Sequence, residues 1–250
     1  MSEPDSGSDL ASIRTRATQT ADGWRLEGRK LWTTNAHRSH FMILLARTSD
    51  GDRRHEGLSQ FIVDLSLPGV EVRPVRDLTG EAHFNEVVLD GVVVDNTDLV
   101  GVEGQGWTQV TTELAFERSG PERFLSSIAA LNAMADAARG SGHPAQTGAI
   151  GRLAARLATL RNMSISVASQ IDSHANPVWA AACVKDFGVS FEQDVMETAA
   201  STFDFASRES DSRDDVETIS YLTQTAPSFS LRGGTREILR GVIARGLGLR

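Results

Sequence analysis

Residues suited to binding and catalysis gather near both ends of this 250-residue chain. Near the C-terminus, Gly233 and Gly234 precede Thr235 and a stretch with apolar residues at helical spacing up to Leu247. A glycine pair lets a ligand approach the backbone. Thr235 can cap a helix whose first N–H groups and dipole attract an oxyanion or a phosphate. A plain turn before a helix is the alternative interpretation.

Two stretches near the N-terminus also have ligand-binding character. Residues 2–9 read Ser-Glu-Pro-Asp-Ser-Gly-Ser-Asp, and such turn-forming and hydroxyl residues can expose N–H and O–H groups to a phosphate-bearing ligand. Residues 30–35 read Lys-Leu-Trp-Thr-Thr-Asn, where an indole beside two hydroxyls can wall a planar heterocycle and hydrogen-bond to it. The alternatives are a flexible tail for the first stretch, and a core tryptophan followed by a turn for the second.

The hydrophobic pattern changes near the middle of the chain and predicts an α+β fold. Residues 12–103 alternate and turn often, which predicts strands at 12–20, 24–32, 41–46, 59–65, 70–74 and 84–94. From Trp107 onward the period is about 3.6, which predicts helices at 107–139 with an interruption at Pro121, and at 147–175, 178–207, 214–225 and 235–247. We therefore expect a small antiparallel β-barrel or sandwich domain over 1–105 and a helical bundle over 106–250, with a solvated loop at 207–215.

Composition narrows the function classes. The chain is 40% hydrophobic, with a formal net charge of -8 and no sustained basic run, so nucleic acid is not the expected partner. No apolar run is long enough for a membrane span, and no signal-peptide pattern follows Met1. The single Cys183 cannot form an internal disulfide, and we expect a small buried side chain there. These features favour a cytoplasmic protein.

Taken in order, three motifs resemble those of the acyl-CoA dehydrogenase family. Residues 2–9 resemble the family's Thr/Ser-Glu-Pro-x-x-Gly-Ser-Asp loop. Residues 28–35, Gly-Arg-Lys-Leu-Trp-Thr-Thr-Asn, resemble its Gly-x-Lys-x-Trp-Ile/Thr-Thr/Ser-Asn strand end. The stretch from Leu231 to Leu249 resembles its closing Gly-Gly-Thr-x-Glu-Ile-x-Arg helix. The resemblance covers most of the chain, although the family's N-terminal helical domain has no counterpart in it.

The resemblance implies FAD as cofactor and an acyl-CoA thioester as substrate, which would lose an α-proton and a β-hydride. It also implies electron-transfer flavoprotein or an equivalent acceptor as a partner, and assembly with the same or a related subunit. The resemblance implies that the FAD-binding residues, near the flavin ring and the phosphates, are Ser2, Gly7, Ser8, Trp32, Thr34, Thr235 and Glu237. For the thioester and CoA the implied residues are Ser8, Arg118, Gly233, Gly234 and Arg245. Gly233 N–H is the expected donor to the thioester carbonyl, where enolate charge develops.

The reaction also needs a carboxylate base. Many family members carry a glutamate at the position that Gly233 holds here, so the commonest base is missing. A minority, the isovaleryl-type enzymes among them, place it on the first long bundle helix in a Leu-Glu-Arg context, which Leu114-Ala-Phe-Glu-Arg resembles. Glu117 is therefore the expected catalytic base, with a structural ion pair as the alternative. Glu113 and Glu122 are weaker candidates.

Two further departures leave other functions open. The family's Arg-x-x-Phe-Gly segment, which grips the FAD of a neighbouring subunit, has no counterpart at 140–146, and its Gly-Gly-x-Gly stretch is absent around 198–208. We expect a dehydrogenase-type subunit. Three explanations of the departures remain: the chain is a piece of a longer enzyme, a short subunit that works with a complete partner in a heteromeric enzyme, or a relative that has lost the chemistry. A flavin-dependent monooxygenase on the same fold, which needs no carboxylate base, is a further alternative.

Overall fold

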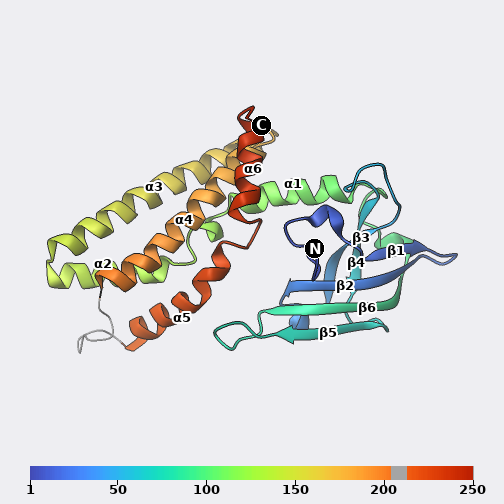
Figure 1. Ribbon diagram of the computed structural model, residues 1–250, viewed down its shortest axis with the longest axis horizontal. Coiled ribbons are helices and arrows are strands. Elements are labelled where there is room, and N and C mark those ends of the chain that lie inside the picture. Colours follow the sequence, from blue (N-terminus) through green and yellow to red (C-terminus); the bar gives the residue numbers. More distant parts are fainter. Residues whose placement is uncertain (204–212, 250) are drawn as a thin grey trace. The chain divides into compact units, whose positions relative to one another are not determined.

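The computed structural model describes residues 1–203 and 213–249. The chain divides into two compact units, Met1–Thr111 and Thr112–Arg250, and the division falls within helix α1, Gly106–Arg118 (Figure 1). The first unit contains the strands and the second contains the bundle helices. The prediction of an α+β fold with a β domain before a helical bundle is confirmed.

The first unit contains one six-stranded sheet with the order β4-β3-β1-β2-β6-β5. Neighbouring strands are antiparallel except for β1 and β3, which pair in parallel through Arg16 and Arg47. The strand bounds are β1 Arg16–Gln19, β2 Trp24–Thr34, β3 Phe41–Arg47, β4 Leu58–Asp64, β5 Val70–Val75 and β6 Phe84–Val94. Short 3-10 helices lie at Leu10–Ser12, Ala36–Arg38 and Asn96–Asp98.

The sheet curls around its own core. Trp24 on β2 and Phe61 on β4 are three strands apart, about 14 Å in a flat sheet. Their rings nevertheless meet edge to face with centroids 5.4 Å apart, and both side chains are buried. This curvature agrees with the compact antiparallel domain that the alternating pattern predicted.

The predicted strands match the structure closely, with one clear error. The strand predicted at 12–20 is a 3-10 turn at Leu10–Ser12 followed by the four-residue β1. The alternation before Arg16 has another cause, since Thr15 is buried and its N–H hydrogen-bonds to Glu3 rather than to a strand. The strand predicted at 24–32 extends two residues further, to Thr34.

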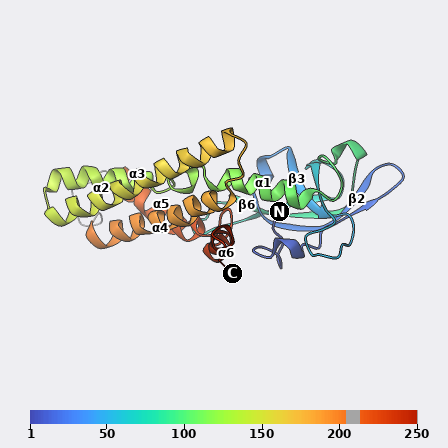
Figure 2. The same cartoon turned by 90° about the horizontal axis from the view of Figure 1, so that it is seen from above.

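The second unit is organised around α4. Helices α2, α3, α5 and α6 all contact it, and α2 to α5 run alongside one another in both views (Figures 1 and 2). The bounds are α2 Ile128–Ser141, α3 Pro144–Asp172, α4 Val178–Thr202, α5 Arg213–Phe229 and α6 Arg236–Gly246. Apolar side chains of α2 to α5 form the core, including Met134, Leu160, Phe191 and Phe229. None of the described helices is long and apolar enough to cross a membrane.

The helix predicted over 107–139 is broken at Pro121, as the sequence indicated. Helix α1 ends at Arg118, and a 3-10 turn, η4 (Pro121–Arg123), precedes α2. Gly120 is extended at φ -66° and ψ 154°, because a residue before proline is disfavoured in the helical region. The break folds the chain back, so residues 117 and 123 come together.

Three other predictions about the helices need correction. The helix predicted to reach 207 ends at Thr202, and 204–212, most of the predicted loop, lies outside the described residues. The helix predicted at 214–225 continues to Phe229, so Pro227 lies inside α5. Cys183 is only partly buried and lines a groove between α3 and α4. The cysteine lies on the side of α4 where Trp179 and Phe187 are also exposed.

Candidate functional site

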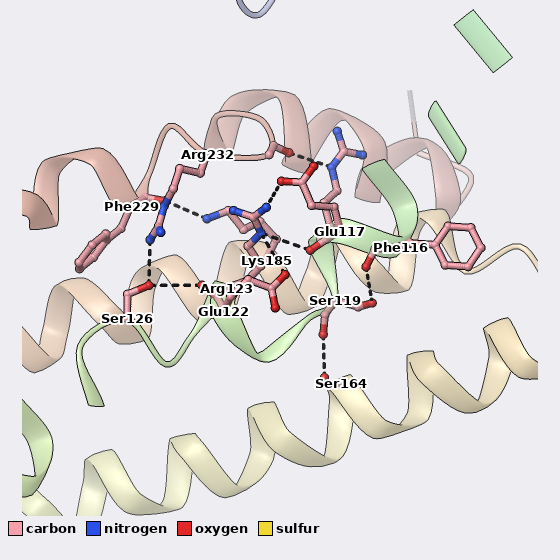
Figure 3. A network of polar contacts seen from close by, with 12 residues as sticks. Phe116, Glu117, Ser119, Glu122, Arg123, Ser126, Ser164, Lys185, Phe229 and Arg232 are labelled. Atoms are coloured by element: carbon pink, nitrogen blue, oxygen red, sulfur yellow. Dashed lines mark hydrogen bonds and ion pairs between the residues drawn. The ribbon is translucent and has the colours of Figure 1, made fainter. Parts of the chain in front are cut away.

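The proposed base lies beside a buried arginine in the second unit. Arg123 forms an ion pair with the Glu117 carboxylate through Nη2, and its Nε donates to the Glu117 carbonyl at 3.2 Å (Figure 3). The Arg123 side chain is 8% exposed, whereas that of Glu117 is 35% exposed. Of the two Glu117 carboxylate oxygens, only Oε1 has a charged partner among the described residues. One edge of the carboxylate is therefore held and the other is free to act.

The glycine pair lies next to this carboxylate. A Cβ added to Gly233 would be 3.9 Å from Glu117 Oε1 and 3.8 Å from Arg123 Cζ. Gly233 has φ +68°, a conformation that glycine adopts without cost. Its carbonyl accepts a 2.9 Å hydrogen bond from Nε of buried Arg118. In the described chain the Gly233 N–H donates to no other group. The structure thus brings four predicted residues together: Glu117, Arg118, Gly233 and Gly234.

More charged groups lie near the Glu117–Arg123 ion pair, on α4 and on the turn before α6. Glu192 is fully buried and accepts from the Ser126 N–H at 2.8 Å. Arg232 donates to Ser126 Oγ at 2.9 Å (Figure 3). The Lys185 ammonium, also buried, donates to the Phe229 carbonyl at 2.8 Å. Burial, reinforced by the positive charge of Arg123, lowers the pKa of Lys185 to about 8. The surroundings of Glu117 are therefore rich in positive charge.

Thr235 occupies the predicted N-cap position of α6, but its hydroxyl bonds to the Glu237 carboxyl instead of to a backbone N–H. Thr235 is the N-cap residue, yet its side chain makes no capping bond. A backbone N–H bond and the Thr235 hydroxyl lower the pKa of the exposed Glu237 carboxyl, which lies in the first turn. Arg245 is exposed in the last turn of the same helix, ten residues further on. Thr235 and Glu237 thus lie together, and Arg245 lies at the opposite end of α6.

In the first unit, a buried ion pair fixes the N-terminal loop. Lys30 Nζ lies 2.9 Å from Glu3 Oε1, and Glu3 also accepts from the N–H groups of Arg14 at 2.7 Å and Thr15 at 2.9 Å. Burial alone would raise the pKa of Glu3, but the charge of Lys30 together with these hydrogen bonds lowers it. The loop is further tied by the Leu31 N–H, which donates to the Ser2 carbonyl at 2.9 Å. Residues 2–9 are therefore not a flexible tail.

Trp32 lies on a strained bulge at the surface of the sheet. Its φ is +62°, rare for a bulky residue, and the register between β2 and β6 shifts between Lys30 and Thr33. The indole is 56% exposed and meets Phe84 edge to face at 5.7 Å. The interpretation of Trp32 as a core residue is thereby wrong. Buried Asn85 holds the strand end, because its Nδ2 donates to the Thr33 carbonyl at 3.0 Å.

The remaining predicted residues of this unit are accessible to a ligand. Gly7, Ser8 and Thr34 are exposed, and Ser2 is partly buried. A Cβ at Gly7 would meet no atom of the described residues within 4 Å. Beside Trp32, the Thr33 hydroxyl is buried and has no hydrogen-bond partner among the residues that the structure describes. In the described residues no group of three or more histidine, cysteine or acidic side chains could hold a metal ion.

Sequence matches assign the chain to a family. The family model "Acyl-CoA dehydrogenase, middle domain" matches residues 1–92, and "Acyl-CoA dehydrogenase, C-terminal domain" matches residues 104–248. The second match alone covers more than half of the chain, so this protein belongs to the acyl-CoA dehydrogenase family, as its three motifs predicted.

Curated relatives and solved structures agree with this assignment. The chain is 47% identical over 117 residues to acyl-CoA dehydrogenase FadE34 of Mycobacterium tuberculosis, a match covering 47% of this chain and 16% of that protein. It is 35% identical over 196 residues to FadE29 of the same organism, which covers 74% of this chain and 50% of that protein. A structure described as "Tcur3481-Tcur3483 steroid ACAD G363A variant" is 26% identical with a TM-score of 0.88, covering 100% of this chain and 67% of that one. The match thus spans at most half the length of these two curated relatives.

Sequence reasoning missed Arg123, Asn85 and the Glu3–Lys30 pair. In an unbroken helix, residues 117 and 123 would be about 1.7 turns apart and on different faces. The Ser-Gly-Pro after Arg118 was the available signal, since it ends the helix and returns the chain. For Asn85 and Glu3 the sequence carried no comparable signal, because their partners lie 52 and 27 residues away.

Proposed function

We propose that this chain is a catalytic part of an FAD-dependent acyl-CoA dehydrogenase. The enzyme would remove an α-proton and a β-hydride from an acyl-CoA thioester. The observation that carries the proposal is the position of the Glu117 carboxylate, beside Gly233 and its unused N–H. In a family member that has glycine where relatives carry a glutamate, this carboxylate is the acidic group that reaches the glycine turn.

Two groups would share the work of proton removal: the Glu117 carboxylate as the base, and the Gly233 N–H as a donor to the thioester carbonyl oxygen. Glu117 takes the α-proton through the oxygen that Arg123 does not hold, and Arg123 fixes the other oxygen. As the proton leaves, enolate charge grows on the thioester carbonyl oxygen, and the Gly233 N–H is a fixed donor for it. The left-handed turn at Gly233 exposes that N–H without competing hydrogen bonds.

The first unit has features that suit a flavin ring. Trp32 offers a flat exposed face, Thr34 an exposed hydroxyl, and Thr33 a buried hydroxyl that lacks a partner. FAD, when bound, supplies the acceptor for the β-hydride. On this proposal Ser2 and Trp32 contact the ring, Thr34 hydrogen-bonds near it, Gly7 and Ser8 lie near phosphates, and Thr235 and Glu237 contact FAD. Arg118 and Gly234 would contact the thioester end, while Arg245 and Ser8 would contact CoA.

An anaerobic flavin titration tests the proposal. The chain, coexpressed with a homologous subunit and loaded with FAD, is mixed with straight, branched and cyclic acyl-CoAs, and the visible flavin band should bleach. Glu117→Gln should reduce bleaching by about 1,000-fold or more, because the base is lost while its shape is kept. Glu113→Gln is the matched control, since Glu113 is exposed on the same helix. Bleaching that survives Glu117→Gln would refute this assignment of the base.

A second candidate is an assisting subunit of a heteromeric enzyme. It is favoured by the missing Arg-x-x-Phe-Gly and Gly-Gly-x-Gly segments, and a structural relative described by the paired name Tcur3481-Tcur3483 lends support. Such a subunit would be colourless alone and would copurify with a related chain in the cytoplasm. Flavin binding without bleaching, unaffected by Glu117→Gln, would favour a monooxygenase instead. Reoxidation by electron-transfer flavoprotein would identify the physiological acceptor.

A further inference from the structure

We propose that Arg123 is the positioning residue for the base, acting on Glu117 through the side chain and the backbone at once. The inference rests on the proposed role of Glu117. Arg123 Nη2 pairs with the Glu117 carboxylate while its Nε donates to the Glu117 carbonyl. One planar guanidinium thus fixes where the carboxylate points and satisfies a backbone carbonyl in the last turn of α1.

The geometry of Arg123 is imposed by its own surroundings. Gly188 on α4 leaves room for η4, because a Cβ there would be 2.5 Å from the Arg123 carbonyl oxygen. Pro121 starts η4 directly after the extended Gly120. The Arg123 side chain is almost fully buried and therefore has little freedom to turn away from Glu117. Gly188 and Pro121 thus fix the backbone of Arg123, and its guanidinium contacts Glu117.

Arg123 also makes the ionised carboxylate favourable. The charged groups around the pair come from four elements. They are Arg118 on α1, Glu122 on η4 at 3.7 Å from Arg123 Nε, Lys185 and Glu192 on α4, and Arg232 before α6. Removing Arg123 would leave the half-buried Glu117 carboxylate without its direct partner. Its protonated, catalytically inert form would then gain population.

Two substitutions separate the charge of Arg123 from its shape. Arg123→Lys keeps a positive charge but cannot reach both the carboxylate and the carbonyl. We expect kcat for flavin reduction to fall about 100-fold, with KM and the acidic limb of the pH profile little changed. Arg123→Gln removes the charge as well, so that limb should also move to higher pH. Arg156→Gln is the control, because it breaks an arginine–carboxylate ion pair, with Asp194, that is more exposed and lies outside this cluster.

A second measurement needs neither flavin nor turnover. In the full chain labelled with ¹³C-glutamate, the Glu117 carboxylate resonance is assigned by its loss in Glu117→Gln. Its titration midpoint should lie at higher pH in Arg123→Gln than in the unsubstituted chain, and should not move in Arg156→Gln. A midpoint that stays in place in Arg123→Gln would overturn the inference. Activity that survives Glu117→Gln would instead overturn the proposed function. If Arg123→Gln does not fold, Arg123→Lys still tests the inference, which fails if kcat is unchanged.

Discussion

Each unit of this protein pairs a glutamate with a buried basic side chain, and the two pairs differ in completeness. Glu3 accepts from two backbone N–H groups and from Lys30, and the two side chains are 7% and 0% exposed. Glu117 has one charged partner within the described part of the chain, Arg123, and is 35% exposed. A carboxylate whose acceptor sites are filled has no capacity left for a proton from a substrate. Glu3 is therefore structural, and the incomplete pair at Glu117 is the one suited to catalysis.

The two buried lysines show the same contrast. Lys30 faces Glu3 directly, whereas Lys185 donates to a backbone carbonyl and lies in the field of Arg123 and Arg232. The first unit neutralises its buried charge within a few ångströms. In the second unit, the buried carboxylate of Glu192 and that of Glu122 lie among the cations near Glu117, and these cations would stabilise negative charge developing nearby.

The largest expected effect separates the two glutamates by stability. Glu3→Gln places an amide NH₂ against backbone donors and leaves Lys30 buried without a counter-charge, so it should cost about 3–5 kcal/mol. Glu117→Gln should cost less than about 1 kcal/mol, because the site is partly solvated and the amide oxygen can still accept from Arg123. Hydrogen exchange read separately for residues 16–34 and 113–123 gives the local stability of each site. Equal losses of unfolding free energy in the two variants would show that both ion pairs stabilise the fold to the same degree and would contradict this contrast.

The second prediction uses the pH dependence of the Lys185 site. Its pKa of about 8 is below the unfolded value near 10.4, so the folded state releases this proton first as the pH rises. The penalty for burying the charge is fully present below pH 8 and disappears as the unfolded lysine deprotonates. The unfolding free energy should therefore rise between about pH 8 and pH 10.5, by up to about 3 kcal/mol relative to Lys185→Met. Urea titrations at several pH values measure the difference, and parallel curves for the two proteins would contradict it.

The sequence predicted more of the fold than of the site, for a physical reason. Alternation and turn residues located five of the six strands closely, and Pro121 marked the helix break, because these signals are local. The family motifs led to Trp32 and Gly233, and the Leu-Ala-Phe-Glu-Arg resemblance led to Glu117, for the same reason. The residues that contact Glu117 and Trp32 and set their geometry are distant in sequence or lie across a chain reversal. Arg123 reaches Glu117 only because η4 turns back, and the strain at Trp32 arises from a register shift against β6. No periodicity in the sequence records either feature.

The smallest expected effect tests how open the Glu117 cluster is. Gly233 has φ +68°, yet a Cβ there would meet its nearest neighbours at 3.8 and 3.9 Å, which is ordinary contact. Gly233→Ala should therefore cost only the left-handed strain, about 1–2 kcal/mol, and leave the Arg118 bond to the residue 233 carbonyl intact. Gly151→Ala is the matched control. Gly151 is exposed within α3 with open space around it, so alanine should stabilise that helix by about 1 kcal/mol. Thermal unfolding of both variants measures the change in stability, which should be a loss for Gly233→Ala and a gain for Gly151→Ala. A loss at Gly233 well above 2 kcal/mol would mean that the turn is packed as tightly as the Glu3 site, and the space that a thioester needs beside Glu117 would not exist.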